Sequence, residues 1–382
     1  MCRELIDFIR KLYGDGYIPL HEPVIGDREK NYVNQALDTG YVSSVGPMVQ
    51  QFETEFASFI GSKHAIGTSS GTSALHLCLL AARVELGDEV ITQSLTFVAT
   101  GNAISYVGGK PIFLDVNEKT LGLCPKALLR FLEQNTEIKN GLCINKITGN
   151  VIKAAIPMHT FGHPCQIDEI AQICEDWKIC LIEDAAEAVG SRYKNRPVGT
   201  HGIVSAFSFN GNKILTTGSG GMVVTNDNDL AIKIRHWTNT AKVQHPWEYY
   251  HDETGYNYRM GNLNAALGLA QLEQVGIFVE RKRSLAEEYR IFFENRPERF
   301  FLEPTNVSSN YWLNAIIFSS QEERNAFLES AHASSIGVRP VWNPLHTLPM
   351  FQHELTDNLT VTNDMAQKLV NLPSSVIEEI TS

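Results

Sequence analysis

The sequence predicts an α/β protein with a large, mostly parallel sheet covered by helices, followed by a smaller α+β part. From about residue 60 to residue 225, short β-rich runs alternate with helical patterns. These runs are continuously apolar rather than alternating in polarity, which is typical of strands buried on both faces. After about residue 260, longer helical patterns and a few short apolar runs replace this alternation. The change predicts a second, smaller part of the chain.

Seven runs are expected to form the strands of the large sheet: 64–67, 89–92, 111–116, 153–158, 178–184, 203–209 and 221–225. The segments between them carry helical patterns, for example TSALHLCLLAA at 72–82 and QIDEIAQICEDW at 166–177. Such an alternation predicts a doubly wound sheet, in which helices join the strands and lie on the faces of the sheet.

The later part of the chain begins with a stretch, 262–296, that reads as one or two long helices. Within it, Arg283 and Glu287 stand four residues apart on one helix face. The runs 311–318 and 337–342 suggest strands. We therefore predict a large α/β domain at 18–260, a small α+β domain at 261–382 and an N-terminal segment at 1–17.

Composition excludes several classes of protein. With 382 residues, 43% of them hydrophobic, the chain can bury a large core, so disorder is not expected to dominate. The formal net charge is −11 and no basic stripe stands out, which argues against a nucleic-acid partner. No apolar run approaches the roughly 18 residues of a membrane span, and the first residues are no secretory signal. The seven cysteines form no C-x-x-C pair, so neither a disulfide scaffold nor a cysteine-rich zinc site is expected. A cytoplasmic protein is predicted.

A seat for an anion is predicted at GTSSGTS, residues 67–73, where an apolar strand meets small residues and a helix begins near Thr72. The first turn of a helix has unpaired N–H groups and a partial positive charge, which favour a bound phosphate. Gly71 lets the phosphate approach the backbone closely, and Ser70, Thr72 and Ser73 can add hydroxyl donors. The alternative is an ordinary helix cap by Ser70 or Thr72.

The same stretch also contains a G-x-S-x-G pattern with Ser69 at its centre, the nucleophile elbow of α/β-hydrolases. The strand–turn–helix context fits that motif. However, the serine comes early in the chain and no HGGG-like loop precedes it. A hydrolase is therefore the weaker alternative.

A carboxylate is predicted at the carboxyl edge of the sheet. The apolar run KICLIED ends in Glu183 and Asp184, and α/β proteins bind ligands at this edge. A buried carboxylate needs a partner, because an unpaired buried charge is costly. A cation in a ligand, such as a protonated ring nitrogen, could be that partner; a helix cap by Asp184 is the alternative.

One lysine stands apart from the others. Lys213, in FSFNGNKILTTGSGG, is flanked by apolar runs and glycines. At pH 7 only about one ordinary lysine amine in 2500 is neutral, but burial and cationic neighbours raise that fraction and make the amine nucleophilic. Ser208 could place a hydroxyl near the same anion as Gly71. The glycine-rich turn at 218–221 leads into a strand rather than a helix, so a Rossmann cofactor site is not expected.

A phosphate seat, a carboxylate for a pyridinium and a sequestered lysine are the three things that pyridoxal phosphate needs. The carboxylate keeps the ring nitrogen protonated, so that the ring can accept electrons. The lysine bonds to the aldehyde and can shuttle a proton.

At this point the chain resembles a known family. QSLTFVATGNAI, PMHTFGHP, IEDAAEAVGS, FSFNGNKILTTGSGGM and GYNYRMGNLNAALGLAQLE are similar to blocks of the DegT-type nucleotide-sugar aminotransferases, in the family's order. The resemblance implies the aspartate-aminotransferase (type I PLP) fold. CINKITGNVIKAAIPMHTFGHP and TAKVQHPWEYYHDETGYNYRM resemble the legionaminic-acid and bacillosamine-pathway branch, which aminates C4 of a UDP- or GDP-linked 4-keto-6-deoxy hexose with glutamate as donor.

The resemblance also implies a role for particular residues. Lys213 matches the lysine that bonds to the cofactor, Asp184 the partner of the ring nitrogen, and Glu187 the residue beside the ring hydroxyl. The remaining matches are Phe97, which stacks on the ring; Gly71, Thr72 and Ser208, which bind the phosphate; and Asn257, which the neighbouring subunit donates to the phosphate. Arg259 could share that last task. A homodimer with shared active sites is therefore implied.

Two alternatives keep the same fold. One is a PLP-dependent sugar dehydratase, but family dehydratases that remove the C3 hydroxyl carry histidine at the lysine position. The other is a regulatory or sugar-binding protein without turnover.

Some polar and aromatic residues are ambiguous. His159 and His163 form H-x-x-x-H, but Gly162 and Pro164 argue against the helix that a metal pair would need, so no metal is expected. By resemblance, His159 borders cofactor or substrate, or it simply closes a hydrogen bond. The aromatic residues could line the nucleotide-sugar cleft or a dimer interface: Trp237, Trp247, Tyr249 and Tyr250.

Overall fold

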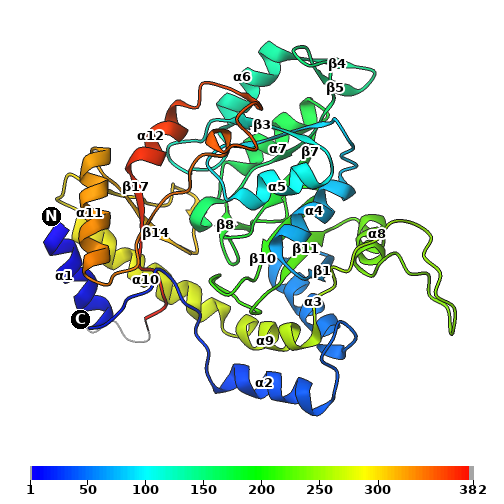
Figure 1. The fold of residues 1–382 in the computed structure, drawn as a ribbon, viewed down its shortest axis with the longest axis horizontal. Coiled ribbons are helices and arrows are strands. Elements are labelled where there is room, and N and C mark those ends of the chain that lie inside the picture. The colour runs from blue at the N-terminus through cyan, green and yellow to red at the C-terminus, as the bar shows by residue number, and fades with distance from the viewer. Residues whose placement is uncertain (1, 378–382) are drawn as a thin grey trace.

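The computed structural model describes residues 2–377. The outermost residues of the predicted N-terminal segment and small domain, 1 and 378–382, lie outside the described residues. At the centre is an eight-stranded sheet with the order β1-β11-β10-β7-β6-β2-β3-β16 (Figure 1). Strands β10 to β16 in this order are parallel, whereas β11 is antiparallel to both β1 and β10. This confirms the predicted fold class.

Each of the seven predicted apolar runs forms a strand of this sheet. They are β1 (His64–Thr68), β2 (Glu89–Gln93), β3 (Lys110–Leu114), β6 (Ile152–Ile156), β7 (Cys180–Asp184), β10 (Val204–Ser208) and β11 (Gly221–Thr225). Strand β16 (Leu355–Thr356) comes from the C-terminal part of the chain and pairs in parallel with β3. The sequence analysis did not predict this edge strand, which has only two residues and no apolar run.

Helices cover both faces of the large sheet, as a doubly wound sheet requires. Apolar residues of one face pack against α4 (Gly71–Ala81), α5 (Val98–Tyr106) and α8 (Asn228–Thr238). The opposite face packs against α3 (Pro47–Ile60), α6 (Pro125–Asn135), α7 (Ile167–Asp176) and α9 (Asn262–Leu272). Neighbouring strand residues divide between the two faces, as Val223 and Val224 do in β11. This two-sided burial explains why the strands are continuously apolar.

The stretch 262–296 forms two helices, α9 and the longer α10 (Val275–Phe293). Beyond α10 lies an antiparallel sheet with the order β12-β14-β17-β15. Its strands and covering helices are β12 (Arg299–Phe300), β14 (Asn314–Ile317), β15 (Arg339–Pro340), β17 (Leu369–Leu372), α11 (Gln321–Ala333) and α12 (Thr360–Lys368).

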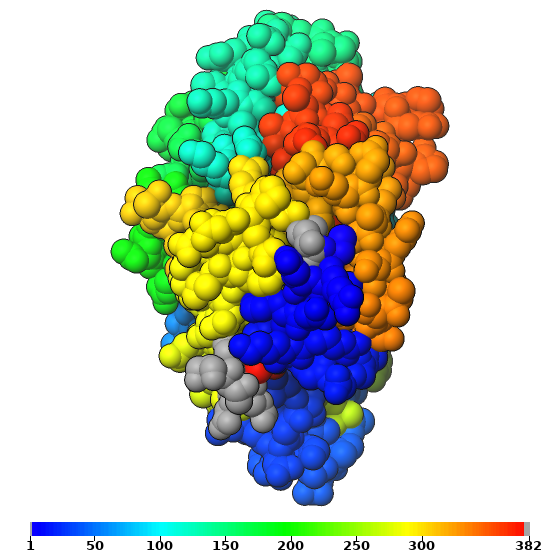
Figure 2. Space-filling model, turned by 90° about the vertical axis from the view of Figure 1, so that its left-hand side faces the viewer, coloured from blue at the N-terminus to red at the C-terminus, as the bar shows by residue number. Residues whose placement is uncertain are grey.

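The N-terminal helix α1 (Cys2–Tyr13) belongs spatially with these C-terminal elements. Its Leu5, Ile6 and Ile9 share a core with residues of α10 and α11. Figure 2 shows the blue N-terminal segment lying against the yellow and orange segments of α10 and α11. Because α1 and β16 each pack outside their own predicted segment, the division at residues 17 and 260 stays a prediction.

The remaining elements are short or peripheral. They are α2 (Asp27–Asp38), β4 (Thr136–Lys139), β5 (Leu142–Asn145), η1 (Thr160–Gly162), β8 (Arg192–Tyr193), β9 (Arg196–Pro197), β13 (Val307–Ser308) and η2 (Leu345–Thr347). Among the helices of residues 2–377, none combines the length and the apolarity that crossing a membrane would require.

The register of the sheet brings three chain segments to one edge. Thr68 at the end of β1 is paired with Gly221, and Gly221 is paired with Ser208 at the end of β10. Asp184 ends β7 and pairs with Ala206 of β10. The strand ends that carry the predicted anion seat, carboxylate and lysine loop therefore meet.

Candidate active site

A cavity of about 350 Å³ opens at this edge of the sheet. Most of its lining comes from the large sheet and its helices, and two tryptophans come from the C-terminal part of the chain. The lining residues include Ser70, Gly71, Thr72, Phe97, Thr100, Asp184, Glu187, Ser208, Lys213, Trp312 and Trp342. The cavity therefore collects seven of the ten predicted site residues: Gly71, Thr72, Phe97, Asp184, Glu187, Ser208 and Lys213.

The anion seat is a tight backbone turn. Ser70 is the N-cap of α4, and its hydroxyl accepts the Ser73 N–H at 3.0 Å. The helix cap does not exclude a phosphate site, because Ser70 caps α4 while Gly71 and Thr72 begin the helix and line the cavity. A side chain at Gly71 is excluded by space, because a Cβ there would lie 2.7 Å from the Ser208 Cβ. This cradle of helix start and hydroxyls suits a phosphate group.

Asp184 presents a carboxylate to the cavity from the end of β7. The Thr100 hydroxyl donates to Oδ2 at 2.7 Å, and the Ala186 N–H donates to Oδ1 at 3.2 Å. Burial raises the pKa of Asp184, and these two hydrogen bonds offset the effect only in part. The carboxylate can still accept a hydrogen bond from a ligand, and a cationic donor would stabilise its charge.

Lys213 and Glu187 form a buried ion pair. The Lys213 Nζ lies 3.1 Å from Glu187 Oε1, and the lysine side chain is only 13% exposed. The other carboxylate oxygen accepts the Phe161 N–H at 2.8 Å. Burial raises the pKa of Glu187 to about 7, although Lys213 counteracts this rise. A carboxyl group of that pKa can take up or release a proton near neutral pH.

Aromatic rings form the outer walls of the cavity. Phe97 lines the cavity and is 51% exposed. Its ring meets that of Trp342 edge-on, with 6.2 Å between the centroids. On the lysine side, the Lys213 Nζ lies 3.7 Å from the centroid of the Trp312 ring.

Sequence reasoning missed Trp312, Trp342 and Thr100. The two tryptophans stand in YWLNAIIF and GVRPVW, which were interpreted only as strands of the small part. Both lie next to short strands rather than within them. The signal that could have revealed them is a large aromatic residue placed just outside a short apolar run, where it does not continue the pattern of that run.

His159 does not line the cavity. It is fully buried, its Nε2 lies 3.2 Å from Glu183 Oε2, and its Nδ1 accepts the Cys165 N–H at 3.2 Å. The neutral tautomer with the proton on Nε2 satisfies both contacts. Of the roles considered for His159, the hydrogen-bonding one matches this geometry.

The H-x-x-x-H pair is not on one helix face. Phe161 and Gly162 between the two histidines have φ angles of +56° and +92°, which break any helix. Burial lowers the pKa of His163 to about 3. Its ring packs edge-on against Phe301 and Tyr311. These histidines therefore have separate surroundings.

Asn257 and Arg259 lie outside the cavity of their own chain. Asn257 is exposed and forms a bridge with Asn239. Arg259 lines a surface groove beside α8 together with Arg235 and His64, and its buried Nε finds no hydrogen-bond partner within the part of the chain that the structure describes.

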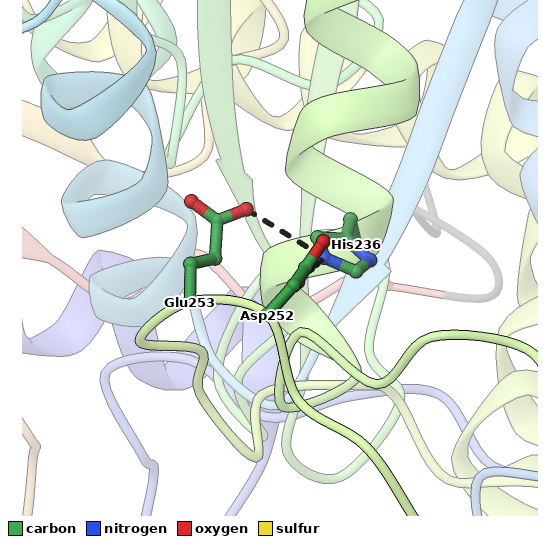
Figure 3. A group of neighbouring side chains, drawn as sticks. All are labelled: His236, Asp252 and Glu253. Atoms are coloured by element: carbon green, nitrogen blue, oxygen red, sulfur yellow. Dashed lines mark hydrogen bonds and ion pairs between the residues drawn. The ribbon is translucent and has the colours of Figure 1, made fainter.

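A group of His236, Asp252 and Glu253 near the end of α8 has the residue types of a metal site (Figure 3). The His236 Nε2 lies 2.6 Å from Asp252 and 3.6 Å from Glu253, while Glu253 also pairs with the Lys233 Nζ at 2.5 Å. When His236 is protonated, the four side chains alternate in charge and tie the exposed segment after α8 to that helix. This arrangement explains the group without a metal ion.

Ser69, the nucleophile of the hydrolase alternative, is exposed at the start of α4. Its hydroxyl lies 3.2 Å from the Ser73 hydroxyl. A second hydroxyl is no general base, so the geometry that a serine nucleophile needs is not formed there.

The chain matches the DegT/DnrJ/EryC1/StrS aminotransferase family over residues 23–378. It is 40% identical over 358 residues to a GDP-perosamine synthase of Escherichia coli O157:H7, covering 94% of this chain and 93% of that protein. A GDP-perosamine synthase of Vibrio cholerae is 37% identical over 360 residues, with 94% of each chain covered. Among solved structures, the Helicobacter pylori aminotransferase PseC, involved in the biosynthesis of pseudoaminic acid, superimposes with a TM-score of 0.84 at 25% identity, covering 94% of both chains.

Proposed function

Since the chain belongs to the DegT/DnrJ/EryC1/StrS aminotransferase family, we propose that it transfers an amino group from glutamate to C4 of a nucleotide-linked 4-keto-6-deoxy hexose. Its class is that of the pyridoxal-phosphate-dependent nucleotide-sugar aminotransferases of surface-glycan biosynthesis. The observation that carries the proposed amino transfer is the meeting of Lys213, Asp184 and the α4 cradle around one cavity.

We propose a GDP-linked, perosamine-like amino sugar as the product. Support comes from two relatives named GDP-perosamine synthase, at 40% and 37% identity over 94% of this chain. The two blocks that resemble the legionaminic-acid and bacillosamine branch are much shorter than these alignments. A UDP-linked sugar of that branch is therefore the second candidate.

The residues around the cavity fit pyridoxal phosphate. We propose that Gly71, Thr72 and Ser208 hold its phosphate, that Asp184 accepts a hydrogen bond from its ring nitrogen, and that Lys213 bonds to it. When bound, the cofactor supplies an aldehyde carbon that can carry the amino group and a ring that can accept electrons. Phe97, which lines the cavity and is half exposed, is proposed to cover one face of the ring.

The chain's own residues supply the proton transfers. We propose that the Lys213 Nζ removes a proton from one side of the reacting carbon–nitrogen unit and returns it on the other. Glu187 Oε1, at 3.1 Å, can take up or return the proton that this amine must lose to act as a base. Asp184 keeps its charge opposite the ring, so that its role is electrostatic.

We propose a homodimer in which Asn257 and Arg259 of one subunit complete the phosphate seat of the other. The support is the exposure of Asn257 and the buried Arg259 Nε, for which the described part of this chain offers no acceptor. Light scattering of the purified protein should give the mass of two chains. A cytoplasmic location stays a prediction, based on the lack of a long apolar run and of a secretory signal in the sequence.

A substrate panel tests the proposed reaction. The holoenzyme would be incubated with glutamate and a set of GDP- and UDP-linked 4-keto hexoses, with measurement of 2-oxoglutarate and NMR of the sugar product. We expect one equivalent of 2-oxoglutarate per amino sugar and faster turnover of the GDP substrates. Loss of the C3 hydroxyl without amination would indicate the dehydratase, and binding without any turnover would indicate the regulatory protein.

A further inference from the structure

Trp312 lies directly against the amine of Lys213. It precedes β14, is 4% exposed, and presents its ring face to the Nζ at 3.7 Å from the ring centroid. On another side, the same amine faces Glu187 Oε1 at 3.1 Å. The amine thus has an aromatic face and a carboxylate as its immediate neighbours, and the ring comes from the C-terminal part of the chain.

Two hydrogen bonds hold Trp312, one from its ring and one from its backbone. Its indole Nε1–H donates to the carbonyl of Asn212 at 2.7 Å. Its backbone N–H donates to the side-chain oxygen of Asn310 at 2.8 Å. Because Asn212 immediately precedes Lys213, the ring is attached to the lysine's own loop.

The Asn310 amide also holds the segment that carries Glu187. Its Nδ2 donates to the carbonyls of Glu187 and Val189, at 2.9 and 2.8 Å. Asn310 is fully buried. One side-chain amide therefore ties together both groups that face the Lys213 amine, the indole through Trp312 and the carboxylate through the Glu187 backbone.

An ammonium group over an indole face is attracted by the ring quadrupole, and the attraction grows as water is excluded. With 13% exposure, the Lys213 side chain is largely desolvated. A free lysine side chain also has several rotatable bonds, so it would otherwise be spread over many rotamers. An indole ring that is itself held by a hydrogen bond to Asn212 can restrict the lysine side chain to one rotamer.

We propose that Trp312 is a positioning residue that holds the ε-ammonium of Lys213 against its indole face whenever this amine is not bonded to the cofactor. The proposal rests on the proposed role of Lys213 and extends it to a residue of the C-terminal part. Held there, the amine stays beside Glu187 and within reach of the cavity for its next proton transfer. The sugar or the amino donor can then occupy the cavity without displacing the lysine to solvent.

The test uses cofactor-free protein, so that Lys213 is a free amine throughout. Acetic anhydride would be added at pH 8, and acetylation of Lys213 would be followed by peptide mass spectrometry, with the exposed Lys139 as internal reference. Loss of the aromatic face in Trp312→Leu should speed acetylation about fivefold, because the ammonium loses its stabilising neighbour. Trp312→Phe keeps a π face and should change the rate by less than about twofold.

Trp342→Leu is the matched control, since it opens the same cavity without touching the Lys213 amine. It should leave the rate of Lys213 acetylation unchanged. Equal rates in the Leu and Phe variants of Trp312, or acceleration by Trp342→Leu as large as by Trp312→Leu, would show that only access matters and would overturn the proposal.

A second series separates the ring's electrostatics from its volume. Replacement of Trp312 by mono-, di- and trifluorotryptophan weakens the quadrupole step by step with little change of shape. The logarithm of the Lys213 acetylation rate should rise with each fluorine, and a flat series would contradict the proposal. Because no cofactor is present, this outcome is independent of whether Lys213 bonds to pyridoxal phosphate.

Discussion

Glu183 and Asp184 are neighbours on β7, both are buried, and they have opposite surroundings. Successive residues of a strand point to opposite faces, so the two carboxylates leave β7 in different directions. Glu183 accepts four N–H groups, from His159, Gly199, His201 and Gly202, at 2.5 to 3.2 Å. Asp184 receives two donors and faces the cavity.

The pKa values of the two groups move in opposite directions. Burial alone would raise the pKa of Glu183, but hydrogen bonds from His159 and His201 hold it well below its usual value. Burial raises the pKa of Asp184, with only partial compensation. A buried carboxylate whose oxygens already accept several hydrogen bonds from the protein has a structural role. One that can still accept hydrogen bonds and faces a cavity is suited to bind a cationic ligand.

The same contrast separates two buried lysines and leads to the largest expected effect. Lys282 is fully buried, donates to the Ser374 carbonyl, and burial lowers its pKa to about 7. Lys213 faces Glu187 and the cavity instead. Lys213→Ala should abolish transamination and the yellow absorption of the holoenzyme, both followed by spectrophotometry. Lys282→Met should retain both the transamination and the yellow absorption. A colourless Lys282→Met protein would contradict the assignment of different roles to the two lysines.

Asp184→Asn and Glu183→Gln test the carboxylates against each other. Removing the Asp184 charge should lower kcat/KM by about 10² to 10³, because the ring nitrogen loses its counter-charge, with little change in the unfolding free energy. Glu183→Gln should cost about 2–4 kcal/mol of unfolding free energy, because an amide nitrogen would face buried N–H donors. Kinetics and urea unfolding of both variants give the answer. If both lose stability equally and activity equally, the two carboxylates do not differ as proposed.

Glu187 tests the pH dependence that burial imposes. Its pKa is raised from 4.5 to about 7, so the folded protein binds this proton more tightly than the unfolded chain. The resulting stability is fully present below about pH 4.5 and is lost as the pH rises to about 7. In cofactor-free protein, Glu187→Gln should remove a slope of up to about 1.4 kcal/mol per pH unit in that window. Unfolding curves of parent and variant that stay parallel from pH 4.5 to 7 would refute this account.

Thr100 should give the smallest effect. Its hydroxyl is one of the two donors to Asp184, so Thr100→Val weakens the support of that charge without removing it. The expected loss is about 1 kcal/mol, or roughly fivefold in kcat/KM. A loss as large as that of Asp184→Asn would mean that the hydroxyl itself takes part in the reaction.

The sequence predicted those features that depend on local pattern. Continuous apolarity predicted the seven long strands, and the position of Asp184 at the end of one of them predicted a carboxylate at the ligand edge. Gly71 next to hydroxyl residues predicted a phosphate seat, and the structure adds that Ser208 leaves no room for a side chain at Gly71.

Other features depend on contacts between distant segments and left little trace in any local pattern. Trp312 meets Lys213 only because the C-terminal part packs over the sheet edge, 99 residues further along the chain. By resemblance, His159 was expected to contact cofactor or substrate or simply to close a hydrogen bond, and its ring lies against Glu183. The three-dimensional packing decides which neighbour a loop side chain contacts, and a single sequence does not specify that packing.

The central claim is that Lys213 is the amine that bonds to pyridoxal phosphate. Borohydride reduction of the holoenzyme makes that bond permanent, and peptide mass spectrometry then identifies the labelled lysine. We predict a phosphopyridoxyl group on Lys213 in close to one copy per chain. A label on Lys282 or on a surface lysine, with Lys213 unmodified, would contradict the account.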